Sequence, residues 1–337
     1  MTTKVKVFFN FFIRFAILGT SLFFLYFQFQ HKVHSGLLKE AAETIHLGMN
    51  VYIFLIFTVL LMFVNWGLEV LKWNILTRSF SQTSVSACVK GVISGITISM
   101  FLPNRIGDVA GKVLWLKQEY RWKGFFANIY TSLAQIAATC MLSVVALTYF
   151  IYRLDDIWLF SVKNSMLLAI MVFLIFLILL VYFNLGRIGM YFSRMKALRF
   201  RQFSQHISVL NIFSMKKKIS ILLLSILRFM VYCTQFYILL SVFGLTLSIA
   251  DGIFLIAVIY LAITIVPQFA IAEIATRGAL AIVVFEVFIQ WGGNYNGHYE
   301  AALLLASTTL WVINLFIPAM AGLTMLPDLS RLKQMKK

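Results

Sequence analysis

The feature that most constrains this chain is a series of long apolar runs. Runs able to span a bilayer as helices, which takes about 20 residues, lie near residues 7–28, 49–76, 124–151, 164–185, 219–243 and 300–326. Of the 337 residues, 12% are charged and 61% are hydrophobic, whereas about 25% of a soluble domain is typically charged. The sequence therefore predicts an all-α polytopic membrane protein with six through-spans, folded as a single integral membrane domain over residues 1–337.

Two further apolar regions, 84–118 and 248–290, are each interrupted by a proline, Pro103 in the first and Pro267 in the second. Proline removes a backbone donor and disfavours helix in the residue before it, so each region should fold as two helix pieces that meet at a break. Such a break is tolerated at membrane depth where it is buried in protein or lines a wet cavity. We expect two re-entrant helix pairs, and full spanning by the pieces is the alternative that the sequence leaves open.

The distribution of charge predicts how the chain is oriented. With a cytoplasmic N-terminus and broken pairs that return to their starting side, the cytoplasmic segments hold eighteen Lys or Arg residues and two acids, and the outer segments hold four bases and six acids. This excess of positive charge inside follows the topology rule. We therefore expect a bacterial-type inner (cytoplasmic) membrane protein with both termini in the cytoplasm. Three spans separate the broken pairs, so the pairs should enter from opposite faces as inverted repeats.

The most basic stretch, residues 187–218, holds eight Lys or Arg residues and no acid. In this topology it is a cytoplasmic loop lying against anionic lipid, where each base contributes about 1 kcal/mol of attraction. We expect either a role in topology alone or a role in gathering anionic lipid, and we do not expect binding of nucleic acid.

Each proline break is followed by an acid and, four residues later, by a base: Asp108 with Lys112, and Glu273 with Arg277. A charge in an apolar segment costs about 2.5 to 3.5 kcal/mol on insertion scales, so charges kept there are functional candidates. Residues four apart share a helix face, and an internal ion pair that neutralises itself is one interpretation. The apolar segments hold more bases than acids, however, so a bound anion is a second interpretation.

The candidate site residues follow from these charges and breaks. We predict lipid-phosphate binding by Arg105, Lys112 and Arg277, with Asp108 and Glu273 orienting the bases or binding a proton, and helix breaks at Pro103, Gly107 and Pro267. Secondary candidates are Arg14, Arg228 and Glu69. Lys72 and Lys90 lie near predicted helix ends, so we expect their side chains to extend to the membrane surface. No metal site is expected, because the three cysteines have no metal-ligand spacing. No catalytic or cofactor site is expected, because the sequence shows no glycine-rich phosphate loop, Ser/His/Asp constellation or heme motif.

Residues 101–108 read FLPNRIGD, which resembles the P-x-R-x-G-[DE] motif of the lysylphosphatidylglycerol synthase transmembrane-region family. The best known member of that family is the flippase part of the multiple peptide resistance factor. The segment from Pro267 through Glu273, Arg277 and Gly278 is similar to the second break of the family. The resemblance implies a polytopic inner-membrane protein that handles a phospholipid or a polyprenyl-phosphate-type lipid.

Carried over by position, the motif places the proline, arginine, glycine and acid of the family on Pro103, Arg105, Gly107 and Asp108. This sequence departs from the family at three points. Lys112 follows the acid by four residues, where many relatives have a base after three, and residues 268–272 read QFAIA where many relatives carry glycines. No soluble synthase domain is evident, so lipid aminoacylation is not expected from this chain.

Two functions of different classes remain. The first is a flippase-like transporter that binds or moves an anionic, phosphate-bearing lipid in a central polar cavity, and is not an enzyme. The second is an accessory or catalytic membrane subunit for transfer onto a polyprenyl-phosphate or phospholipid intermediate, with Asp108 or Glu273 as a base or metal ligand. It would be favoured by a separately encoded transferase partner or by dependence on a divalent metal. In both cases the expected partner is a membrane lipid.

Overall fold

The long apolar runs fold as long helices. The computed structural model describes residues 49–100, 106–153, 164–194, 208–266, 273–290 and 299–326, and every regular element in these ranges is helical. Five helical segments in them are long and apolar enough to cross a membrane, as the sequence predicts for five of its six spans. The all-α, multi-pass architecture is therefore confirmed, and the predicted span at 7–28 lies outside the described residues.

Four of the five segments are single helices and the fifth is composite. The single helices are α3 (Met49–Thr77), α6 (Arg121–Arg153), α7 (Asn164–Arg194) and α10 (Met215–Val242). The composite segment consists of α13 (Tyr299–Trp311), a π-helical turn (Val312–Phe316) and α14 (Ile317–Leu323). Short helical turns at Gln118–Tyr120 and at α9 (Val209–Ile212) lead into α6 and α10.

Helix α3 is polar on its buried face and apolar on its exposed face. Asn65, Glu69 and Lys72 are buried, whereas Leu60 and Phe63 are more than half exposed. The three polar residues are four and three positions apart, a spacing that places them on one side of a helix. Hydrocarbon solvates exposed Leu and Phe well, so a membrane helix turns its few polar groups toward neighbouring helices. The polar face of α3 is therefore directed into the protein.

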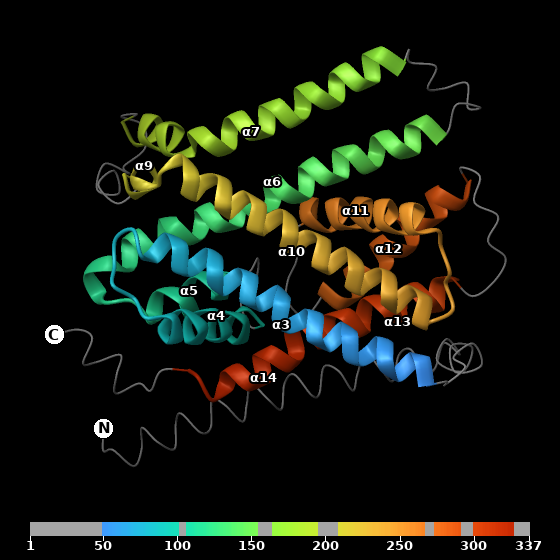
Figure 1. Cartoon of the computed structure of the whole chain (residues 1–337), viewed down its shortest axis with the longest axis horizontal. Helices are drawn as coiled ribbons and strands as arrows, with labels where there is room; N and C mark the ends of the chain where they lie inside the picture. The colour runs from blue at the N-terminus through green and yellow to red at the C-terminus, as the bar shows by residue number, and fades with distance from the viewer. Residues whose placement is uncertain are drawn as a thin grey trace.

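The first broken region forms α4 (Val85–Ser99) and α5 (Ile106–Leu114), which lie side by side (Figure 1). Their 15 and 9 residues give lengths of about 22 and 14 Å at 1.5 Å per residue, less than the roughly 30 Å of a hydrocarbon core. Glycines allow the two backbones to touch, because a Cβ on Gly111 would lie 2.2 Å from the backbone nitrogen of Gly95. This region is therefore a tightly packed pair of half-length helices.

The second broken region forms α11 (Ile249–Ile265) and α12 (Glu273–Gln290), which pack against each other. The two pairs lie at opposite ends of the long helices (Figure 1). The pair α4 and α5 lies where α3 ends and α6 begins, and the pair α11 and α12 lies where α10 ends and α13 begins. This placement fits entry from opposite faces, and the inverted-repeat relation stays a prediction.

Two apolar cores hold α6 and α10 in place. One core gathers around Trp73 between α3, α4, α6 and α10, and the other gathers around Phe236 and Phe285 between α6, α10, α11, α12 and α13. Helices α6 and α10 contribute to both cores. Together with α3 they carry most of the buried polar side chains of the candidate site.

Candidate functional site

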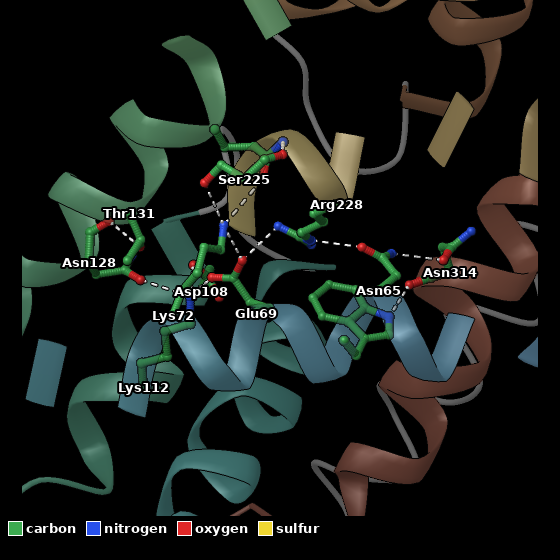
Figure 2. Close-up of polar contacts among 12 residues, drawn as sticks. Asn65, Glu69, Lys72, Asp108, Lys112, Asn128, Thr131, Ser225, Arg228 and Asn314 are labelled. Carbon is green, nitrogen blue, oxygen red and sulfur yellow. Dashed lines mark hydrogen bonds and ion pairs between the residues drawn. The ribbon is translucent and has the colours of Figure 1, made fainter. Parts of the chain in front are cut away.

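Glu69 on α3 is the centre of a buried cluster of charges (Figure 2). Its Oε1 accepts a hydrogen bond from Lys112 Nζ at 2.7 Å, and its Oε2 accepts one from Arg228 Nη1 at 2.7 Å. The same Oε2 lies 2.9 Å from Lys72 Nζ. The Glu69 residue is only 4% exposed, so its charge depends on these partners. One carboxylate thus faces three bases, which are contributed by α3, α5 and α10.

Lys112 is fully buried and uses all three of its donors. Besides Glu69, its Nζ contacts Asp108 Oδ2 at 2.9 Å and Asn128 Oδ1 of α6 at 2.9 Å. The pair of Asp108 and Lys112 is the internal ion pair that one interpretation of the sequence predicts, and the contact with Glu69 extends that pair into a larger cluster. The side chain of Asp108 is 23% exposed, so it is the most open charged group in the cluster.

The expectation that Lys72 reaches the membrane surface is wrong. Its side chain is fully buried, and besides Glu69 it donates to Gln135 Oε1 at 3.2 Å and to Ser225 Oγ at 3.3 Å. Helices α6 and α10 cover this end of α3, so the ammonium group finds acceptors in the interior. Lys90, by contrast, is half-buried, with its Nζ 5.3 Å from the ring centre of Trp115.

Arg228 on α10 uses only some of its N–H groups in hydrogen bonds. Its Nε donates to Asn65 Oδ1 at 2.7 Å, and its guanidinium carbon lies 5.0 Å from the ring centre of Trp66 and 5.6 Å from that of Tyr232. These distances are within the range of cation–π attraction. The bonds to Asn65 and Glu69 use two of its five N–H groups. In the described part of the chain the remaining three form no hydrogen bond, so Arg228 has unused donors.

The polar network continues from Arg228 to the π-helical turn. Asn65 Nδ2 donates to Asn314 Oδ1 at 3.0 Å, Asn314 Nδ2 donates to Gln235 Oε1 at 3.1 Å, and Gln235 Nε2 donates to the carbonyl of Thr58 at 2.9 Å. Asn314 lies in the turn Val312–Phe316, and π-helical turns are frequent at functional sites. A continuous chain of polar contacts therefore joins α5 to the composite last span.

The cluster carries more positive than negative groups. Lys72, Lys112 and Arg228 oppose Glu69 and Asp108, which leaves one formal positive charge when all five are ionised. Burying charges costs free energy that close partners and further hydrogen bonds must offset, and here every charged group has such partners. The excess charge makes this interior attractive to an anion.

The structure brings together four of the predicted site residues, namely Glu69, Asp108, Lys112 and Arg228. Arg277 is buried on α12, which packs against α11 and α13, and the ion pairs of Glu69 described above do not include it. The roles predicted for these residues stay predictions.

The other predicted residues are less fully placed. Gly107 is the second residue of α5, where a Cβ would lie 2.2 Å from the backbone nitrogen of Ser99, so it serves close helix packing. Glu273 begins α12, but its side chain is not described. The remaining predicted residues, Arg14, Pro103, Arg105 and Pro267, lie outside the described residues.

Several members of the network escaped sequence reasoning, and a periodic pattern could have found them. Polar residues recur at helical spacing within apolar helices. The members that the sequence did not single out are Asn65, Asn128, Thr131, Gln135, Ser225 and Gln235. With Glu69, Lys72 and Arg228 they form one such set on each of α3, α6 and α10. Each set falls on one face of its helix. Three polar stripes in apolar helices therefore indicate a shared polar interior.

Within the described ranges, no group of three or more His, Cys, Asp or Glu side chains is arranged to hold a metal ion. Cys88, Cys140 and Cys233 are free thiols, and Cys88 and Cys233 are buried. The Glu69 cluster itself offers ammonium, guanidinium and carboxylate groups, which can bind an anion and hold or exchange a proton.

Comparison with known proteins gives one family match. Residues 11–322 match the family model described as "Lysylphosphatidylglycerol synthase TM region". No curated protein and no solved structure matches the chain.

Proposed function

Because the chain belongs to the lysylphosphatidylglycerol synthase transmembrane-region family, whose match covers residues 11–322, we propose that it is a flippase-like transporter of an anionic, phosphate-bearing lipid. A relation to lipid handling in the membrane follows from the family itself. The observation that carries the finer proposal is the buried cluster of three bases and two acids. Moving a charged head group through hydrocarbon is costly, and an interior with excess positive charge lowers that barrier.

The head-group phosphate would be bound by bases of the interior. Arg228 suits this role because a planar guanidinium with unused N–H groups can hold two phosphate oxygens at once. We keep Arg105, Lys112 and Arg277 as further phosphate-binding candidates, and Asp108 and Glu273 as the groups that orient the bases or carry a proton. The bound lipid would be an anionic phospholipid or a polyprenyl phosphate.

The broken helices support movement as well as binding. Half-length helices that meet inside a membrane occur at the substrate sites of transporters with repeated halves, and α5, which carries Asp108 and Lys112, is one such piece. The first N–H groups of such a helix have no partner within the helix and favour negative charge. We further propose that the protein lies in the cytoplasmic membrane with both termini in the cytoplasm.

The test is lipid translocation by the purified protein in liposomes. Fluorescent phosphatidylglycerol should be moved, and Asp108→Asn and Arg277→Gln should each abolish its movement while leaving the helical content and the elution volume unchanged. Lys117→Gln is the matched control, because Lys117 is an exposed base near the end of α5. Wild-type translocation in both variants would eliminate this site.

The assay also bears on the accessory or catalytic alternative. Absence of translocation by the wild-type protein, together with divalent-metal-dependent transfer onto a lipid-linked intermediate, would replace the transporter proposal with that alternative.

A further inference from the structure

We propose that Lys72, Lys112 and Arg228 form an oxyanion-binding site whose resting occupant is the carboxylate of Glu69. In this view Glu69 is a tethered ligand, and a small free oxyanion takes its place when the carboxylate is removed. That a lipid phosphate displaces Glu69 in the working protein is a corollary that rests on the proposed function.

The three bases surround one carboxylate as the side chains of an anion-binding site would. Their nitrogen atoms lie 2.7 to 2.9 Å from the two oxygens of Glu69, and they come from α3, α5 and α10. Charge-assisted hydrogen bonds from several bases to one oxyanion are the usual means of carboxylate and phosphate recognition. Glu69 is thus bound as a receptor would bind a separate anion (Figure 2).

Each lysine is also held in place by groups other than Glu69. Lys112 is fixed by Asp108 and Asn128, and Lys72 is fixed by Gln135 and Ser225. Removal of the Glu69 side chain would therefore leave two of the three bases tied to their present positions. A site that is already organised binds its ligand without the cost of ordering it.

The third base is held in the same way and adds capacity for a larger ligand. Arg228 is fixed by Asn65 and lies against the rings of Trp66 and Tyr232. Two of its five N–H groups are used in the described structure, so it can bind an additional anionic oxygen. A phosphodiester carries one negative charge, as a carboxylate does, so in a variant without the Glu69 carboxylate it would restore the charge that the substitution removes.

The test is anion binding by Glu69→Ala, with formate as the probe. The thermal unfolding midpoint of the detergent-purified variant is measured in a series of sodium formate concentrations, with sodium chloride at equal ionic strength as the reference. We expect the midpoint of Glu69→Ala to rise by roughly 2 °C at ten times the Kd of formate. The wild type, whose site is occupied by its own carboxylate, should respond no more to formate than to chloride.

The matched control is Asp251→Ala. Asp251 is also a buried carboxylate, but it accepts hydrogen bonds from the hydroxyl groups of Tyr149 and Ser248 at the start of α11. Its variant should show no specific response to formate. Equal responses of Glu69→Ala and Asp251→Ala would overturn the proposal.

A second pair of variants keeps the test decisive if Glu69→Ala does not fold. The double variant Glu69→Ala with Lys72→Met carries one base fewer, so its uncompensated positive charge is smaller. Its unfolding midpoint should rise in formate, whereas that of Lys72→Met alone, which retains Glu69, should not. No rise in the double variant would overturn the proposal.

The formate response tests the oxyanion site and the translocation assay tests the proposed function, so a negative result in one leaves the other standing. A formate response without translocation by the wild type keeps the oxyanion site and removes the proposed function. Translocation of phosphatidylglycerol without any formate response in the Glu69 variants keeps the function and removes the oxyanion site.

Discussion

At the scale of residues, the interior of this protein keeps charges that hydrocarbon would not tolerate singly. The cost of burying Glu69 is offset because three bases surround it. The cost of burying Lys72 and Lys112 is offset because each also donates to neutral acceptors. A buried charge that loses its partner retains the cost of burial without the compensation. The members of the cluster should therefore be sensitive to single substitutions.

Arg228→Ala should destabilise the protein by about 3 kcal/mol, at the low end of the range for breaking a buried ion pair, because Glu69 keeps its two lysines. It also leaves Asn65 Oδ1 without its donor. Unfolding in SDS, followed by the loss of helical signal, measures the change. Arg187→Ala removes an exposed arginine about two turns before the end of α7 and should change stability little. An equal effect of the two variants would contradict the role given to Arg228.

At the scale of elements, the pair of α4 and α5 positions Asp108 and Lys112. Gly91 and Gly95 on α4 and Gly107 and Gly111 on α5 have the four-residue spacing of the glycine motifs that allow close helix packing in membranes. The contact is between backbones: a Cβ at Gly111 would lie 2.2 Å from Gly95 N and 2.3 Å from Gly95 Cα. Backbone atoms cannot move aside as a flexible side chain can.

Gly111→Leu should therefore separate α4 from α5 and lower stability by at least the roughly 1 to 3 kcal/mol typical of overpacking. Since Asp108 and Lys112 move with α5, translocation should be lost as well. Gly67→Leu is the control, because a Cβ at Gly67 on α3 would meet nothing within 4 Å. Unfolding in SDS and translocation in liposomes measure both effects, and a tolerated Gly111→Leu would refute the packing argument.

At the scale of the whole molecule, the sequence predicts the architecture better than the site. Length and hydropathy are local properties, so the apolar runs identify the described spans, and the prolines mark both broken regions. The partners of Glu69 could not be predicted in this way. Lys112 is 43 residues distant along the chain and Arg228 is 159, and only the packing of α3, α5 and α10 brings them together. For the same reason the sequence misplaced Lys72.

The predicted orientation can be checked with single cysteines. Gln82 lies in the exposed loop between α3 and α4, and Thr246 lies in the exposed loop between α10 and α11. With the N-terminus in the cytoplasm, a membrane-impermeant thiol reagent added to intact cells should label Thr246→Cys and should label Gln82→Cys only after the cells are opened. The wild type, with its three native cysteines, is the blank. Labelling of both variants from one side would contradict opposite entry of the broken pairs.

The most direct measurement of the central claim is native mass spectrometry of the lipids that remain bound to the purified protein. The wild type should retain a phosphate-bearing anionic lipid, and Arg228→Gln should retain less of it, while Lys117→Gln should match the wild type. Neutral lipids alone on the wild type, or identical anionic lipid on the wild type and Arg228→Gln, would contradict the account.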